Sequence, residues 1–125
     1  MKKSNLKSQI KGVVFFDLDH YEDDRGWLVE LFRNDFLFPC NYPVMAYVSQ
    51  TKPGIIRGPH EHEVQSDLFC FIGPGNFELT LWEKSEKTIS NRLTDVIYEE
   101  RHLLGECNPK AVIVPPGVVL SLIHI

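Results

Sequence analysis

Residues 76–83 read Asn-Phe-Glu-Leu-Thr-Leu-Trp-Glu, and this alternation of polar and apolar side chains has the period of a β-strand. Successive side chains of a strand point to opposite faces of the sheet, so one face of this segment should contact an apolar core. The other face should contact solvent or a cavity. The stretch follows Gly73-Pro74-Gly75, residues that are typical of a tight turn. The sequence therefore predicts a strand, half-buried, that begins directly after a turn.

Similar short runs recur on both sides of this strand. We predict strands at Gly12–Leu18, Trp27–Phe32, Val44–Gln50, Gly54–Arg57, Asp67–Ile72, Asn76–Trp82, Thr94–Glu99 and Ala111–Val114. Turn residues such as Lys52-Pro53-Gly54 and Pro115-Pro116-Gly117 separate them. The best helix candidate is the short stretch Arg33–Phe38. Many short strands with Gly/Pro turns predict an all-β sandwich or barrel.

The bulk properties are those of one soluble globular domain. The chain has 125 residues, of which 43% are hydrophobic and 24% charged. A net charge of -4 argues against nucleic acid and anionic membranes as main partners, because both require a basic face. No apolar run approaches the roughly 18 residues of a membrane span, and no signal peptide is recognisable. We expect residues 1–9 to be a disordered N-terminal segment.

The cysteines indicate a reducing compartment. Cys40, Cys70 and Cys107 form no recognised motif, and an odd number cannot close a disulfide framework. We therefore expect reduced thiols and a cytoplasmic protein. Cys70 lies inside an apolar run and is best interpreted as a small buried hydrophobe.

Residues 54–62, Gly-Ile-Ile-Arg-Gly-Pro-His-Glu-His, carry the strongest functional pattern. Two β-branched residues predict a strand, and Arg57 and His60 follow at its end. A guanidinium binds phosphate or carboxylate bidentately. A neutral imidazole nearby can take a proton from a carbon that the bound anion positions. The segment therefore predicts an anion-binding site next to a general base.

Three segments together resemble the dTDP-4-dehydrorhamnose 3,5-epimerase family of the cupin superfamily. Residues 54–60 match its Gly-aliphatic-aliphatic-Arg-Gly-x-His run, and Asp24–Phe32 matches an Asp-x-Arg-Gly segment followed by apolar residues and a Glu. Val114–Gly117 matches a Val-Pro-x-Gly turn. The matches come in the family's order and cover roughly residues 12–119. The resemblance implies a cupin-type jelly-roll β-sandwich or barrel, with a single cupin/epimerase-like domain over residues 10–119.

The resemblance also implies roles for individual residues. His60 would be the catalytic base, Arg57 would bind the diphosphate, and His62 and Gln65 would contact substrate. Arg25 and Glu30 would reach the nucleotide in the site of a neighbouring subunit, as a homodimer with N-terminal strand exchange. The implied activity is that of an isomerase, a sugar-nucleotide epimerase acting on a dTDP-4-keto-6-deoxyhexose without a cofactor. Such an enzyme would serve deoxysugar and polysaccharide biosynthesis.

Two positions depart from the family pattern and leave alternatives open. Glu61-His62 stands where the family has a Tyr-Gln pair after its His, so His62 is a departure, and Asp67 stands where the family has a Lys that helps to stabilise the enolate. These departures indicate a divergent branch. His60, His62 and Asp67 could instead be three ligands of Zn, Fe or Mn in a metal-dependent cupin. A sugar-nucleotide binding domain without catalysis is the other alternative.

The last six residues, Leu-Ser-Leu-Ile-His-Ile, are what the nucleotides CTG TCT CTT ATA CAC ATC encode. This string resembles a transposon end used to tag DNA fragments for sequencing. We therefore expect residues 120–125 to be a non-native tail on a C-terminally truncated reading frame. The family's general-acid Tyr and the Asp partner of its His would lie beyond Val119, so we expect the chain as written to be impaired.

The remaining histidines and aromatic residues are given ordinary structural roles. His20 and His102 lie in charged stretches and are predicted to be solvated. Trp82 and five phenylalanines are predicted to be core rather than stacking platforms, namely Phe15, Phe16, Phe69, Phe71 and Phe77.

Overall fold

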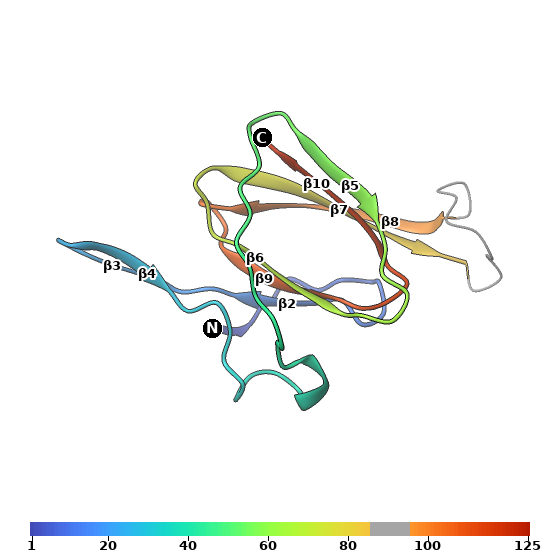
Figure 1. Ribbon diagram of the computed structural model, residues 1–125, viewed down its shortest axis with the longest axis horizontal. Helices are drawn as coiled ribbons and strands as arrows, with labels where there is room; N and C mark the ends of the chain where they lie inside the picture. The colour runs from blue at the N-terminus through green and yellow to red at the C-terminus, as the bar shows by residue number, and fades with distance from the viewer. Residues whose placement is uncertain (86–95) are drawn as a thin grey trace.

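The computed structural model describes residues 1–85 and 96–125 (Figure 1). Within these residues the chain forms strands and one 3-10 turn. The elements in chain order are β1 (Lys2–Lys3), β2 (Val14–Asp17), β3 (His20–Asp23), β4 (Gly26–Val29), η1 (Pro39–Asn41), β5 (Ile56–His60), β6 (Asp67–Phe71), β7 (Asn76–Lys84), β8 (Val96–Gly105), β9 (Lys110–Val114) and β10 (Val119–His124).

The strands form two antiparallel four-stranded sheets and a separate hairpin. One sheet has the order β1-β2-β9-β6, the other has the order β5-β10-β7-β8, and β3 pairs with β4. Figure 1 shows the two sheets facing each other, with the β3–β4 hairpin projecting from one end. The predicted all-β sandwich is therefore confirmed.

The core between the sheets follows from strand alternation. Leu79 and Leu81 of β7 are fully buried, and their register partners in β10 are Leu122 and Leu120, which are also buried. Partners in a ladder point to the same side of the sheet, so these four leucines share the inner face. Phe15 and Val112, which are partners in the facing sheet, pack in the same cluster. The predicted alternation of residues 76–83 is confirmed at these positions.

A second apolar cluster lies on the outer face of the β1-β2-β9-β6 sheet. Phe16 and Ile113 are buried there beneath Leu37 and Met1. Cys70 packs at the edge of this cluster, where its Sγ lies 3.4 Å from the carbonyl oxygen of Leu31. Burial raises the pKa of the Cys70 thiol to about 11, because the thiolate would lose its hydration. The segment after β4 therefore closes one face of this sheet.

Most predicted strands are present with shifted ends. The Gly54–Arg57 strand begins later and runs to His60, and the Thr94–Glu99 strand extends to Gly105 from Val96, while Thr94 lies outside the described residues. The core assignment of the phenylalanines is confirmed, with Phe15, Phe16 and Phe71 buried and Phe69 and Phe77 partly buried against the core.

Two predicted elements are wrong. Arg33–Phe38 forms turns rather than a helix, and the only regular backbone nearby is η1. One helical turn is costly to nucleate, and Pro39 has no N–H with which to extend it. Val44–Gln50 is extended but is not assigned to a strand, and Val44 and Val48 are 100% and 94% exposed. A strand requires a neighbouring edge, and in the described part of the chain none pairs with this segment.

Both ends of the chain contribute a strand to a sheet. Lys2–Lys3 of the segment expected to be disordered pair with β2, and Met1 and Ser4 are buried. Residues 120–124, expected as part of a non-native tail, belong to β10. Among the described residues, the structure contains no helix with the length and apolar character of a membrane span.

Candidate functional site

The end of β5 brings Arg57 and His60 to the same face of their sheet. In the antiparallel pairing of β5 with β10, Arg57 lies opposite Leu122 and His60 opposite Leu120, with a register shift between them. Between these pairs, Gly58 and Pro59 of β5 lie opposite the single residue Ser121 of β10, which is a β-bulge. In a regular strand, residues three apart point to opposite faces. The extra residue restores the parity, so both side chains share the inner face with the two leucines.

Gly58 makes this bulge possible. Its φ is +113°, a conformation that L side chains rarely adopt. A Cβ at this position would lie 2.8 Å from the carbonyl oxygen of Leu120 and 3.1 Å from the Cα of Ser121. Both contacts are with backbone, which cannot rotate away. The glycine therefore allows β10 to approach closely at the point where β5 bulges.

The Arg57 guanidinium is held in a fixed orientation. Its Nε donates a hydrogen bond to Thr51 Oγ1 at 2.7 Å, and its Nη2 donates to the Gln50 carbonyl oxygen at 3.0 Å. Thr51 is buried, with 5% of its surface exposed, while Arg57 is exposed. These bonds leave the N–H groups of Nη1 available to an anion. A guanidinium that is oriented in advance loses less entropy when it binds phosphate.

His62 lies outside β5, which ends at His60, so strand alternation does not set the direction of the His62 imidazole relative to that of His60. His62 Nε2 lies 3.0 Å from Asp67 Oδ2 at the start of β6. The other carboxylate oxygen of Asp67, Oδ1, accepts a hydrogen bond from Gln65 Nε2 at 2.7 Å. His62, Gln65 and Asp67 therefore form one hydrogen-bonded cluster on the loop that joins the two sheets.

Arg25 and Glu30 lie apart from this cluster. Arg25 is in the β3–β4 hairpin, where its side chain is 91% exposed and its Nη2 lies 2.5 Å from Asp23 Oδ2. Hydrogen bonds from Arg25 lower the pKa of the Asp23 carboxyl. Glu30 Oε2 lies 3.4 Å from Arg33 Nη1. Figure 1 shows the hairpin projecting away from β5. Within one chain these two residues are therefore not brought together with Arg57 and His60.

The alternative metal site is not assembled. Across residues 1–85 and 96–125, no group of three or more His, Cys, Asp and Glu side chains is placed to hold a metal ion. His62 and Asp67 are in contact, but His60 does not complete a set of three with them. The two contacting residues form a His–carboxylate pair instead.

The structure also reveals groups that the sequence analysis missed or misplaced. His102 was predicted to be solvated, but its side chain is only 12% exposed and its Nε2 lies 3.4 Å from Glu100 Oε1. Its ring centroid is 4.7 Å from that of Phe15, and Ser8 Oγ is hydrogen-bonded to Glu100. Glu100 and His102 are register partners of Leu81 and Leu79, so they face the core. The shared parity of Tyr98, Glu100, His102 and Leu104 was the sequence signal for this placement.

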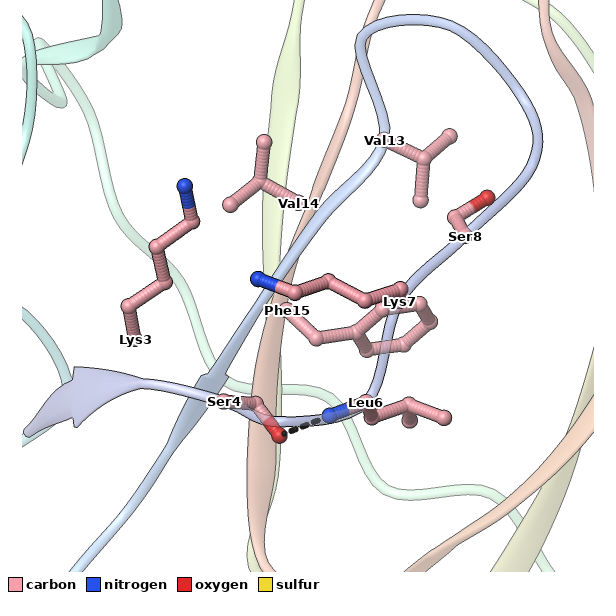
Figure 2. Close-up of a pocket in the computed structure, with 8 residues that line it drawn as sticks. All are labelled: Lys3, Ser4, Leu6, Lys7, Ser8, Val13, Val14 and Phe15. Atoms are coloured by element: carbon pink, nitrogen blue, oxygen red, sulfur yellow. Dashed lines mark hydrogen bonds between the residues drawn. The ribbon is translucent and has the colours of Figure 1, made fainter.

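A cavity of about 130 Å³ lies beside the N-terminal segment and β2 (Figure 2). Apolar side chains, among them Val13 and Phe15, form part of its wall, and Lys3 and Lys7 also line it. The predicted site residues are not part of this lining. The residues that the sequence analysis indicates as a site therefore lie outside this cavity, and Arg57 and His60 lie on β5.

The chain is similar in sequence to proteins of glycan biosynthesis. It is 34% identical over 109 residues to the spore coat polysaccharide biosynthesis protein SpsL of Bacillus subtilis. This match covers 87% of this chain and 68% of SpsL. It is 30% identical over 107 residues to the probable low-salt glycan biosynthesis epimerase Agl13 of Haloferax volcanii. This match covers 85% of this chain and 65% of Agl13. The chain thus spans about two thirds of the length of each relative. No protein-family model matches it.

The fold is also found among solved epimerases. The dTDP-6-deoxy-D-glucose-3,5-epimerase RmlC from Legionella pneumophila Philadelphia 1, solved in complex with dTDP-4-keto-L-rhamnose, superposes with a TM-score of 0.68 at 16% identity. The match covers 96% of this chain and 64% of that protein. The expected cupin-type jelly roll is therefore confirmed. Sequence similarity and fold agree: the chain belongs to the dTDP-4-dehydrorhamnose 3,5-epimerase family of the cupin superfamily.

Proposed function

We propose that the chain is a sugar-nucleotide epimerase that acts on a dTDP-4-keto-6-deoxyhexose during deoxysugar and polysaccharide biosynthesis in the cytoplasm. The observation that carries the proposal is the bulge in β5, which puts Arg57 and His60 on one face of the sheet. The roles of SpsL and Agl13 in glycan biosynthesis, as their names give them, support the pathway, and the ligand of the Legionella enzyme supports a dTDP-linked 4-keto sugar. Three free cysteines agree with a reducing compartment.

His60 would act as the general base. A C–H bond next to the 4-keto group becomes acidic when the carbonyl oxygen is polarised, because the electron pair can move into an enolate. His60 takes the proton, and the enolate is reprotonated to give the epimer. This chemistry moves protons only, so it requires neither a metal nor a nicotinamide.

Arg57 would bind the diphosphate and thereby set the position of the sugar relative to His60. Its bonds to Thr51 and Gln50 fix the plane of the guanidinium before ligand arrives. Holding the reacting carbon next to the base converts binding energy into rate. Arg57 therefore contributes affinity, and His60 contributes the chemical step.

We also propose that the chain forms a homodimer in which the β3–β4 hairpin of each subunit reaches the neighbouring subunit. Arg25 and Glu30 would then contact the nucleotide in the partner's site. Trp27 and Leu28 on this hairpin are 52% and 59% exposed, and Met45 and Tyr47 of the extended segment are 70% and 78% exposed. In this proposal, these exposed apolar side chains belong to the surface that the partner chain covers. Light scattering coupled to gel filtration should give the mass of two chains, and a mass of one chain would contradict the assembly.

The function is tested by proton exchange. The chain is incubated in deuterium oxide with a dTDP-4-keto-6-deoxyhexose, and deuterium at the carbons beside the keto group is measured by mass spectrometry. His60→Gln should abolish incorporation while dTDP affinity is kept. Arg57→Ala should weaken dTDP binding about 10- to 100-fold, as expected for loss of a charge-assisted hydrogen bond. Arg101→Ala, which removes an exposed arginine from β8, is the matched control. Ligand binding without exchange by the unaltered chain would indicate a binding domain without catalysis.

A further inference from the structure

The direction of the His60 ring depends on the backbone. His60 is exposed, and in the described part of the chain no group forms a hydrogen bond or an ion pair with its imidazole. A side chain without such a partner follows the direction of its Cα–Cβ bond, which the backbone on both sides sets. Before His60, the backbone is shaped by the bulge at Gly58 and Pro59. The contacts that hold the chain after His60 therefore decide where the ring points.

Two contacts hold the chain directly after His60. Gly117 N donates a hydrogen bond to the His62 carbonyl oxygen at 2.9 Å, in the turn that precedes β10. The Glu61 carboxylate forms an ion pair with the Lys84 ammonium. The first contact is made by backbone groups, which almost every residue carries. The second contact depends on the identity of two side chains.

The ion pair joins two strands that are not neighbours. In the sheet order β5-β10-β7-β8, β10 lies between β5 and β7. Glu61 follows directly after β5, and Lys84 is the last residue of β7. β10 begins only at Val119, which lies opposite Trp82. The pair therefore links the ends of β5 and β7 at the point where the strand between them begins.

The ion pair lies on the outer face of this sheet. Leu81 is buried in the core between the sheets, and Lys84 is three positions further along β7, so its side chain points away from that core. The extra residue of the register shift at this end belongs to β8, so β7 keeps its alternation. Glu61 must reach the outer face to meet Lys84. Neighbouring residues of an extended chain point to opposite faces, so an outward Glu61 directs His60 inward, to the face that it shares with Arg57.

Both charges of the pair are enclosed. The Glu61 side chain is 11% exposed and the Lys84 side chain 14% exposed. Glu61 Oε2, the oxygen that contacts Lys84, is buried and has no further partner among the described residues. Removing one partner of a buried pair leaves a charge without compensation, whereas an exposed pair such as Arg101–Glu78 opens at little cost. A contact that resists opening can hold the end of β5 in place.

We infer that the Glu61–Lys84 ion pair directs the His60 imidazole, so that Glu61 and Lys84 are positioning residues of the site. This inference rests on the proposed epimerase function. Neither side chain touches the substrate in this role, because His60 removes the proton. Without the pair the end of β5 can turn, and a displacement of about 1 Å between base and reacting carbon lowers the rate about 100-fold. Arg57 lies before the bulge and is held by Thr51, so diphosphate binding should be kept.

The test removes the anchor without leaving a buried charge. In the double variant Glu61→Gln/Lys84→Met both charges are lost at nearly constant size, an exchange that proteins often tolerate. Deuterium incorporation from deuterium oxide into a dTDP-4-keto-6-deoxyhexose should fall about 10- to 100-fold in kcat, with KM and dTDP affinity unchanged. Lys84→Arg keeps the ion pair and should retain most of the kcat. Glu78→Gln breaks the exposed pair with Arg101 between β7 and β8, and as the matched control it should leave kcat unchanged.

A second measurement does not depend on catalysis. Correlation spectra of the imidazole ¹⁵N and ¹H nuclei report the surroundings of each ring, and the His60 signal is assigned by its absence from His60→Gln. The Glu61→Gln/Lys84→Met variant should shift or broaden this signal, and Glu78→Gln should not.

The possible outcomes are distinguishable. Wild-type kcat in the folded double variant overturns the inference, and so does an unchanged His60 signal. A fall of kcat and dTDP affinity together also overturns it, because the whole site would then be disturbed. Equal kcat values for Lys84→Arg and the double variant would count against the ion pair. Absence of exchange by the unaltered chain removes the proposed epimerase function, whereas the His60 signal still decides whether the pair holds the ring.

Discussion

Replacing Gly58 by alanine tests the backbone geometry on which the site depends. Gly58 has a φ of +113°, and the added methyl carbon would lie 2.8 Å from the carbonyl oxygen of Leu120. The neighbouring strand must therefore shift, or the bulge must flatten. Either change separates Arg57 from His60 or alters their common face.

The expected cost can be worked out from these two effects. An L residue in the left-handed region costs about 1–2 kcal/mol. Crowding against packed backbone adds about 1–3 kcal/mol, by analogy with overpacked cores. Gly58→Ala should therefore lower the free energy of unfolding by about 2–5 kcal/mol. Gly54→Ala is the matched control, because Gly54 has a φ of +78° but no atom within 4 Å of the added carbon. It should cost about 1–2 kcal/mol.

Urea unfolding followed by tryptophan fluorescence measures both variants, since Trp27 and Trp82 lie in different parts of the fold. Gly58→Ala should also weaken dTDP binding, whereas Gly54→Ala should not. Equal unfolding free energies for the two variants would show that β10 does not approach Gly58 closely, and the argument for a shared face would fail.

Two further predictions concern titratable groups. Iodoacetamide at pH 8 should label the exposed thiols of Cys40 and Cys107 quickly and Cys70 slowly, because burial raises the pKa of Cys70 to about 11; rapid labelling at all three would contradict its burial. The Lys110 ammonium, 2.7 Å from Asp17 Oδ1, lowers the pKa of that carboxyl, so the ion pair stabilises the fold at neutral pH and is lost as the pH falls below about 4. Asp17→Asn should thus cost on the order of 1 kcal/mol at pH 7 and less at pH 3, measured by urea unfolding, and a cost that grows with acid would reverse the sign.

Features set by short-range patterns were predictable from the sequence. The alternation in residues 76–83 gave β7 and its buried face, and the strand before Arg57 was found because β-branched residues follow a turn. The false strand at Val44–Gln50 has the composition of a strand, but pairing depends on an edge elsewhere, which composition does not encode. The false helix at Arg33–Phe38 was too short to be decided by propensity.

The candidate site was predictable in its residues but not in its geometry. Arg57 and His60 were identified by type and spacing, yet a spacing of three in a strand places side chains on opposite faces. Only the register against β10 shows the bulge that brings them to one face. The contact between His62 and Asp67 depends on how the loop after β5 turns toward the other sheet. His102 was misjudged because charged neighbours in sequence are not neighbours in a strand, where alternate residues share a face.

The extended segment Val44–Gln50 has a consequence for amide hydrogen exchange. Its backbone does not take part in the hydrogen-bonded strand pairing of either sheet. We therefore expect its N–H groups to exchange with solvent far faster than those of β7 or β10. When a second chain or a nucleotide sugar covers the segment, that exchange should slow there while the rates in the sheets stay constant. Slowed amide exchange in the peptides that contain this segment would therefore show that a second chain or a nucleotide sugar covers it, without any added label.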